Sequence, residues 1–234
     1  MTFWQSLIDA ARLLLTGYPE LWRVIGLTMQ VTGSALAISA VVGIPVGAAI
    51  ALSRFPGRHL LVTVLYTGMG LPPVVVGLAV YLFLSRRGPL GGLDWLFTPP
   101  AMIVAQAIIA FPLVAGLTIA GLEGVDPDLR LQLRSLGASQ AQVVRALLVE
   151  ARGGVLAALL AGFGGIISEV GAAMLVGGNI AGQTRVLSTA IVLETRQGEF
   201  ALAVAMGGVL LGLAFGVNAL LLGLERRPNW RTGR

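Results

Sequence analysis

Apolar residues run through this chain in long stretches that short charged segments separate. No ionisable side chain occurs in residues 24–53, 60–85, 95–122 or 200–224, and a fifth stretch, 153–184, holds only Glu169. Each stretch exceeds the roughly 20 residues that an α-helix needs to cross the hydrocarbon of a bilayer. The alternation typical of barrel strands is missing, and helices are the other way to satisfy the backbone in lipid. The pattern therefore predicts five membrane-spanning helices, at about 22–52, 60–84, 98–122, 154–177 and 200–224.

Composition agrees with a membrane-embedded, all-α helical bundle. Hydrophobic residues make up 56% of the 234 positions and charged residues 12%, whereas about a quarter of a soluble domain is charged. We expect a transmembrane domain at 22–224, preceded by an N-terminal segment, 1–21. Asp9 and Arg12 lie there among aromatic and aliphatic residues, which favours an amphipathic helix in the membrane interface over a disordered end. Residues 225–234 form a polar tail.

Arginine distribution predicts the orientation of the bundle. Loops 53–59 and 123–153 and the C-terminal tail hold ten of the sixteen arginines, and the opposite loops and the N-terminal segment hold six. Positive residues favour the cytoplasmic side. We therefore expect the N-terminus outside and the C-terminus in the cytoplasm.

Missing residue types exclude several kinds of chemistry. The chain has no Cys, which rules out thiolate metal sites, disulfides and cysteine nucleophiles. It has no Lys, because all sixteen basic residues are Arg, so a P-loop with its phosphate-binding Lys is excluded. The one histidine, His59, stands next to a predicted span and is expected at the membrane interface. We expect no catalytic residues and no metal site.

The most polar internal segment, "VDPDLRLQLRSLGASQAQVVRALLVEAR" (125–152), has the chemistry of two short helices. Asp126 can cap the first helix and Pro127 fits its first position. Gly137 is a natural left-handed stop, and Ser139 can cap the second helix. Leu129, Leu133 and Leu136 are expected to share one apolar stripe. Spacing alone leaves open whether this segment packs against its own bundle or projects toward a partner.

Anchored on Gly137, the segment resembles the cytoplasmic signature of permease subunits of binding-protein-dependent ABC importers. That signature reads Glu-Ala-Ala, three residues, Gly, nine residues, Ile-x-Leu-Pro. Leu131–Leu133 occupy the Glu-Ala-Ala positions, and Leu147, Val149 and Glu150 those of Ile, Leu and Pro. The family's acid and proline are thus replaced, while the helix–Gly–helix frame is kept. The resemblance implies a type I ABC importer permease fold, with a loop, 123–153, that docks on a separate ATPase subunit. The implied docking residues are Leu129, Arg130, Leu131, Gln132, Leu133, Leu136, Gly137, Ala138 and Ser139.

Two further stretches narrow the resemblance. "LPPVVVGLAVYLFLSRRGPLG" and "ISEVGAAMLVGGNIAGQTRVLSTAIVLETRQGEFALA" look like permeases of oxyanion importers, and the second is most similar to tungstate-type permeases, which are related to molybdate permeases. The resemblance implies a pair of copies of this chain, ATPase subunits that bind ATP and magnesium, and an extracytoplasmic oxyanion-binding protein. It implies that ATP and magnesium are bound by the partner and that this chain holds no cofactor. The net charge of +5 in a membrane protein reflects orientation, so we expect no nucleic-acid partner.

Four residues within the spans are candidates for the translocation path or its gate: Ser168, Glu169, Pro72 and Pro73. A carboxylate in a span is costly and normally faces a bundle interior or a wet cavity, so Glu169 is a candidate for organising a gate or for holding helices together. Its predicted helical neighbours, which include Gly162 and Ala172, are small. Paired prolines bend or break a helix, and broken helices often border a path. An innocent kink and a structurally bonded Glu remain the alternatives.

Small residues and outer-loop arginines complete the candidates. Gly43 and Gly47 in the first span, and Gly208, Gly212 and Gly216 in the fifth, recur every four residues and predict close packing, more often within one subunit. The stretch 179–199 is too polar to span but has an apolar centre, which predicts a short half-helix. Arg185 and Arg196 on that side are candidates for meeting an anion or an acidic surface.

Two other classes of function remain open on the residues alone. A channel or secondary transporter would need ionisable relay residues in several spans, and only Glu169 is available. An intramembrane hydrolase would need a nucleophile and base, which the composition does not offer.

Overall fold

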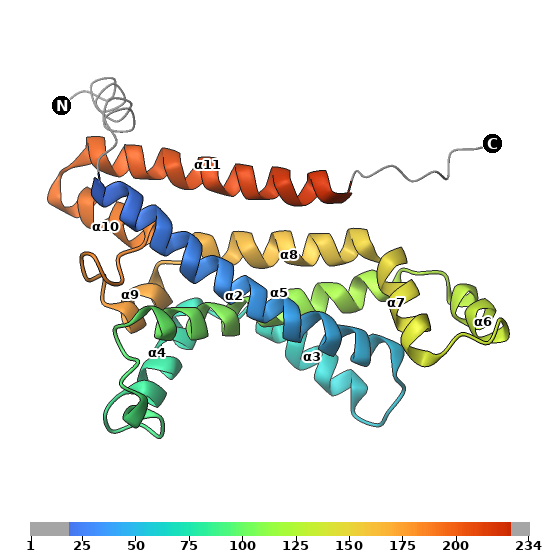
Figure 1. Ribbon diagram of the computed structural model, residues 1–234. Coiled ribbons are helices and arrows are strands. Elements are labelled where there is room, and N and C mark those ends of the chain that lie inside the picture. The colour runs from blue at the N-terminus through green and yellow to red at the C-terminus, as the bar shows by residue number, and fades with distance from the viewer. Residues whose placement is uncertain (1–18, 226–234) are drawn as a thin grey trace.

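The computed structural model describes the backbone of residues 19–225 and the side chains of residues 19–223. The expected interfacial helix at 1–21 and the tail at 225–234 fall almost wholly outside these residues. The described residues form an all-α structure, and the main elements are packed roughly along one long direction (Figure 1). The predicted fold class is therefore confirmed.

Three helices are long and apolar enough to cross a membrane alone: α2 (Pro19–Leu52), α5 (Pro99–Glu123) and α11 (Phe200–Glu225). Two further pairs pass the same test together but are sharply bent. α3 (Arg58–Met69) and α4 (Pro73–Leu84) meet at 101°, and α7 (Gln140–Glu150) and α8 (Arg152–Ile167) at 69°. Five spans result if each bent pair counts as one.

The predicted fourth span, 154–177, is not one helix. α8 ends at Ile167, and the chain resumes as the short helix α9 (Gly171–Gly177). The 16 residues of α8 rise about 24 Å, which is less than the thickness of the hydrocarbon core. The predicted half-helix at 179–199 is confirmed as α10 (Leu187–Gln197), which packs against α11. The remaining elements are a turn of 3₁₀-helix, η1 (Gly91–Leu93), and α6 (Pro127–Ser135).

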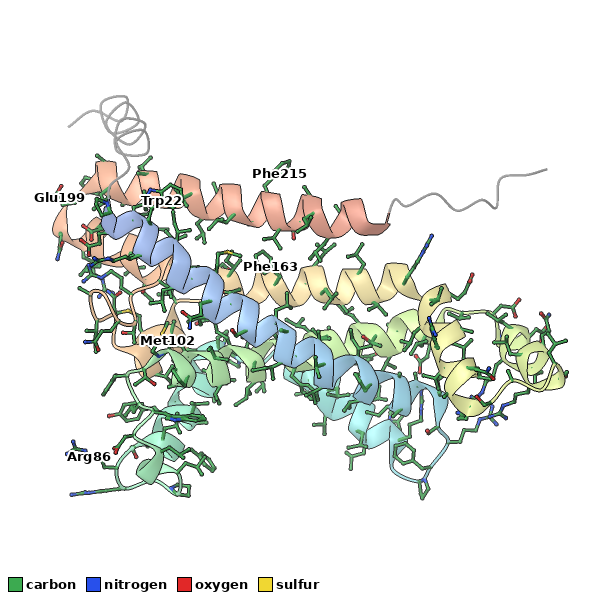
Figure 2. All side chains as sticks on the ribbon, viewed as in Figure 1. Trp22, Arg86, Met102, Phe163, Glu199 and Phe215 are labelled. Carbon is green, nitrogen blue, oxygen red and sulfur yellow. The ribbon has the colours of Figure 1, made fainter. Side chains whose placement is uncertain are left out.

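Helix α5 is the centre of the bundle. It packs against α2, α3, α4, α8 and α9, and 56% of its most apolar window is buried, against 17% for α11. Met102 of α5 and Phe163 of α8 lie inside the bundle, whereas Phe215 points away from α11 and is 76% exposed (Figure 2). A membrane helix with so little protein contact presents most of its side chains to lipid or to another chain.

Glycines set the closest helix crossings around α5. A Cβ added at Gly47 of α2 would lie 2.6 Å from the carbonyl oxygen of Ala115, and one at Gly154 of α8 would lie 2.6 Å from Cα of Gly121. The prediction of close packing at Gly43 and Gly47 is confirmed. The same prediction is wrong for α11 within the described residues, because none of their atoms outside this helix comes within 4 Å of a Cβ added at Gly208, Gly212 or Gly216.

Gly47→Ala should destabilise the α2–α5 crossing, because the added methyl group would meet backbone that cannot move freely. We expect a loss on the order of 1–3 kcal/mol in the free energy of unfolding, measured by denaturation of the purified protein in detergent micelles. Gly26→Ala is the matched control, since Gly26 lies in the same helix with no atom within 4 Å of an added Cβ. Alanine there should be neutral or stabilising by up to about 1 kcal/mol. Equal effects at both positions would contradict this account of the crossing.

Candidate functional site: a two-helix protrusion and paired helix breaks

Helices α6 and α7 form a protrusion at one end of the molecule, beyond the ends of α2 and α5 (Figure 1). Its first helix begins as the sequence predicts. The side chain of Asp126 accepts a hydrogen bond from the backbone N–H of Asp128 at 2.9 Å, and Pro127 is the first helical residue. The cap satisfies one of the donors that a helix start leaves free.

The turn between the two helices is closed by backbone hydrogen bonds. Gly137 has φ = 81°, as predicted, and its N–H donates to the carbonyl of Arg134 while the N–H of Ala138 donates to that of Leu133. This pair of bonds is the Schellman arrangement, which favours glycine at the left-handed position. Ser139 then starts α7 in a capping box with Gln142, so the prediction of a second cap is confirmed. The turn is therefore a fixed corner.

The predicted docking residues fall on two sides of this corner. Leu129, Leu133 and Ala138 pack against a core cluster that holds Val143 and Leu147 of α7, together with residues from the ends of α2 and α5. Arg130 lines a cavity of about 750 Å³ next to this cluster. These contacts hold the protrusion on its own bundle.

The other side of the protrusion is exposed and apolar at its centre. Leu131 is 62% exposed and Leu136 is 84% exposed, and with Asp128, Gln132 and Ser135 they line a shallow groove of about 480 Å³. The predicted stripe of Leu129, Leu133 and Leu136 is wrong at its last member, because α6 ends at Ser135 and the turn directs Leu136 outward. Two large exposed leucines on a short, rigid polar segment are typical of a surface that a partner covers.

Two helix breaks lie close together on the bundle, with Pro72 and Ser168 exposed. The α3–α4 break lies at Gly70–Pro72, where Pro72 precedes α4 and Pro73 is its first residue. The α8–α9 break lies at 168–170. α4 packs on α9 so closely that a Cβ added at Gly171 would lie 2.4 Å from Cγ2 of Val74. The same Cβ would lie 3.3 Å from Oε1 of Glu169. The structure thus places Glu169 close to the start of α4, just after Pro73.

Glu169 does not lie in a continuous helix, so the predicted face of small neighbours along one span is wrong. Instead its Oε1 accepts a hydrogen bond from the N–H of Ala172 at 2.8 Å, which caps the start of α9. Its carbonyl oxygen accepts a hydrogen bond from the hydroxyl of Ser188 on α10 at 2.8 Å. Ser168 is exposed and donates back to the carbonyl of Gly164 at 3.0 Å. Hydrogen bonds from α9 and α10 therefore hold the break at Glu169.

Two polar residues that the sequence analysis does not single out hold the end of the bundle opposite the protrusion in place. Thr28 of α2 accepts a hydrogen bond from the N–H of Leu187 at the start of α10, at 2.9 Å. Thr184 donates to the carbonyl of Gly177 and accepts from the N–H of Ile180. Both threonines are buried. The position of Thr28 within a charge-free apolar stretch is a signal that could have identified it, since buried polar groups are normally hydrogen-bonded. Thr184 stands between Gln183 and Arg185 and has no such signal.

Charge at the two ends of the bundle is organised differently. At the protrusion end, Arg58 bonds both the carbonyl of Ile50 and the carboxylate of Glu123, which joins the start of α3 to the ends of α2 and α5. At the opposite end, Arg185 pairs with Glu20, whereas Arg196 is exposed near the end of α10. His59 is exposed at the start of α3. Among residues 19–223, no group of three or more His, Cys, Asp or Glu side chains could hold a metal ion.

A family model described as "Binding-protein-dependent transport system inner membrane component" matches residues 43–229. The chain belongs to this family. The expected kinship with permease subunits of ABC importers is confirmed, and such permeases are membrane components of transporters and not enzymes themselves. The match covers both the protrusion and the paired breaks.

Curated relatives of this permease cover nearly its whole length. It is 42% identical to the "Probable anion ABC transporter permease protein" of Haloferax volcanii. The 212 aligned residues cover 88% of this chain and 91% of the relative. It is 40% identical to the "Tungstate uptake system permease protein TupB" of Peptoclostridium acidaminophilum, over 92% of this chain and 95% of that one. The "Molybdenum transport system permease protein ModB" of Escherichia coli is 30% identical, over 92% and 98%.

Solved structures confirm the fold of the permease. A bacterial ABC transporter "involved in the import of the acidic polysaccharide alginate" superposes with a TM-score of 0.74 at 22% identity, over 92% of this chain and 82% of that one. The type I importer fold is therefore established for this chain. A multi-pass location in the membrane follows from the family and the apolar helices together.

Glu169 offers a test of the paired breaks in this permease. Glu169→Gln keeps an oxygen that can accept the N–H of Ala172, so the free energy of unfolding should change by only a few tenths of a kcal/mol, whereas Glu169→Ala should cost about 1 kcal/mol through the lost cap. We expect Glu169→Gln to assemble normally and to transport at an altered rate, because it removes the charge beside α4. Unfolding in micelles and uptake in proteoliposomes measure the two effects. Unchanged uptake in Glu169→Gln would remove the charge from the mechanism.

Proposed function

We propose that this chain is the membrane-spanning permease of an ATP-driven importer that moves tungstate across the cytoplasmic membrane. The observation that carries this substrate is the 40% identity to a tungstate uptake permease, over 92% of this chain. Molybdate, or a sulfate-like oxyanion, is the alternative, since tungstate and molybdate are nearly isosteric dianions and molybdenum permeases are also relatives.

In this proposal two copies of the chain form the passage and a separate pair of ATPase subunits binds ATP and magnesium. An extracytoplasmic binding protein delivers the oxyanion. This chain itself holds no cofactor. The exposed leucines of the protrusion support the ATPase contact, because a groove in another protein can bury Leu131 and Leu136 while the inner leucines keep the protrusion on the bundle. The partners of this chain are thus protein and lipid, and not nucleic acid.

The arginines at the protrusion end of the bundle support an orientation in the membrane. The protrusion and the adjoining loop carry Arg54, Arg58, Arg130, Arg134, Arg145 and Arg152. Positive residues favour the cytoplasmic side, which is also where ATP is found. The proposal therefore places the protrusion and the C-terminus in the cytoplasm, and the start of α2 with α10 outside.

The mechanism in this proposal is mechanical. Closure of the ATPases displaces the protrusion as a unit, because its corner is fixed by backbone bonds at Gly137. The displacement passes through the bent junction of α7 and α8 to the break before α9. The paired breaks at Pro72–Pro73 and Ser168–Glu169 are the points at which α4 and α9 can shift relative to α3 and α8, and so open or close a path.

Reconstituted uptake tests the function directly. Proteoliposomes that contain the permease, its ATPase subunit and external binding protein should take up labelled tungstate only with internal ATP. Omission of the ATPase should abolish uptake. ATP-independent uptake would instead indicate a channel or a secondary transporter. Titration of the cognate binding protein with tungstate and molybdate separates the two substrates.

Leu136→Ser tests the docking surface. Because Leu136 is 84% exposed, its truncation should leave the unfolding of the permease unchanged, but an interface anchor costs more than about 1.4 kcal/mol, so ATPase affinity should fall about tenfold or more. Leu90→Ser is the matched control, because Leu90 is 48% exposed at the opposite end. The measurement is the binding of purified ATPase to permease in nanodiscs. Equal ATPase affinity in both variants would contradict docking at Leu136.

A further inference from the structure

The loop between α9 and α10 covers a small charged cavity at the start of α2. The cavity has a volume of about 320 Å³, and its polar lining consists of Glu20, Arg23 and Arg185. Val24 and Leu27 form an apolar wall, and Ala181 and Gly182 form the rim. Two guanidinium groups and one carboxylate give the lining a net charge of +1. Neither Arg196, Glu194 nor Glu199 of the neighbouring α10 region lines it.

The loop around the cavity is rigidly built. The backbone N–H groups of Gln183, Thr184 and Arg185 all donate to the carbonyl of Ile180. Thr184 is fully buried and joins this turn to the end of α9, and Gly182 supplies a left-handed residue, with φ = 72°. The backbone of Arg185 is therefore fixed by this turn, which lowers the entropy cost of placing its side chain against a ligand.

Arg185 has hydrogen-bonding capacity that the described part of the chain does not fill. One nitrogen, Nη1, donates to Oε1 of Glu20 at 3.3 Å, but the buried Nε has no hydrogen-bond partner among residues 19–223. The side chain is 17% exposed. A buried, charged donor without an acceptor is costly. The deficiency is relieved if a small shift of this guanidinium lets an oxyanion accept from it.

The cavity is also connected to the break at Glu169. Three residues after Arg185, Ser188 donates to the carbonyl of Glu169, and between them Leu187 is bonded to Thr28 of α2. A shift of the backbone at Arg185 would therefore move Ser188 and, through its hydrogen bond, the segment that joins α8 to α9. The cavity is a separate place from the break but is held by the same short piece of chain.

We propose that Arg23 and Arg185 form an outer binding site for the transported oxyanion, which the permease occupies before the anion reaches the paired breaks. The site takes small tetrahedral oxyanions, because a guanidinium presents paired donors that match two oxygens of such a group. Without an anion, Arg185 donates a hydrogen bond from Nη1 to Glu20. When the anion binds, this N–H donates to the anion instead. The assignment of the side and the ligand class rests on the proposed function.

A single introduced thiol tests this site without any transport measurement. The chain has no cysteine, so Ala181→Cys places one reactive group of this subunit at the rim of the cavity. In the assembled transporter in nanodiscs, millimolar molybdate, tungstate or sulfate should slow labelling of this thiol by an anionic methanethiosulfonate. Chloride at the same ionic strength should not. Gly92→Cys is the matched control, because Gly92 is exposed, has open space around it and lies outside the cavity.

Removal of the arginines completes the test. Arg185→Gln or Arg23→Gln in the Ala181→Cys background should raise the oxyanion concentration needed for protection about tenfold, since a hydrogen bond to a charged group is lost. Arg196→Gln removes an exposed arginine outside the cavity and should leave protection unchanged. Arg185→Lys should restore protection only in part, because lysine lacks the paired donors.

Three outcomes would overturn the proposal. They are protection no greater than that by chloride, equal loss in Arg196→Gln, and protection by unliganded binding protein alone, which would make the arginines a docking surface for its acidic residues. Because protection is read without transport, it can fail while ATP-dependent uptake persists, and uptake can fail while protection persists. The site and the proposed function are therefore tested separately.

Discussion

A helix that breaks within a bilayer must find partners for the backbone groups that the break sets free, because lipid offers none. In this permease, the polar side chains near the breaks meet that demand. Glu169 caps α9, Ser188 bonds the carbonyl of Glu169, and Thr28 receives the first N–H of α10. On the α4 side, Pro72 and Pro73 lower the demand, because neither carries an N–H. The interrupted spans therefore depend on a handful of side chains for their stability.

This constraint explains how much of the fold the sequence could predict. Charge-free stretches located the apolar segments well, because the cost of a charge in lipid is local and large. Caps and the left-handed glycine in the protrusion were predictable for the same reason: Asp126, Gly137 and Ser139 act on residues two or three positions away. The break before Pro73 was also visible, since proline acts on its own helix.

The break at 168–170 was not predictable in this way. Its stability comes from Ser188, which is 19 residues away, and from the packing of α4 on α9. Hydropathy cannot register such contacts, so the stretch 154–177 resembled one helix. The exposed position of Leu136 was missed because the stripe assumed a helix that continues past Ser135. The pair of Arg185 and Glu20 lies 165 residues apart, and only the fold could bring these two charges together.

Some helix contacts in the bundle are more closely packed than others. The crossings of α5 with α2 and α8 occur at glycines, where backbone meets backbone and little movement is tolerated. The helix direction changes at the bent junctions, by 101° between α3 and α4 and by 69° between α7 and α8. Relative movement is therefore expected at the junctions, while α5 and its neighbours keep their packing.

The Schellman corner at Gly137 gives the protrusion the property of a stiff lever. A flexible loop would change its own conformation when its tip is displaced, and the displacement would not reach the helices behind it. This corner is closed by two backbone hydrogen bonds, and both of its helices are capped, so it has little freedom to change conformation. In the proposed mechanism, a displacement imposed at Leu136 is therefore passed toward the start of α8 with little loss at this corner.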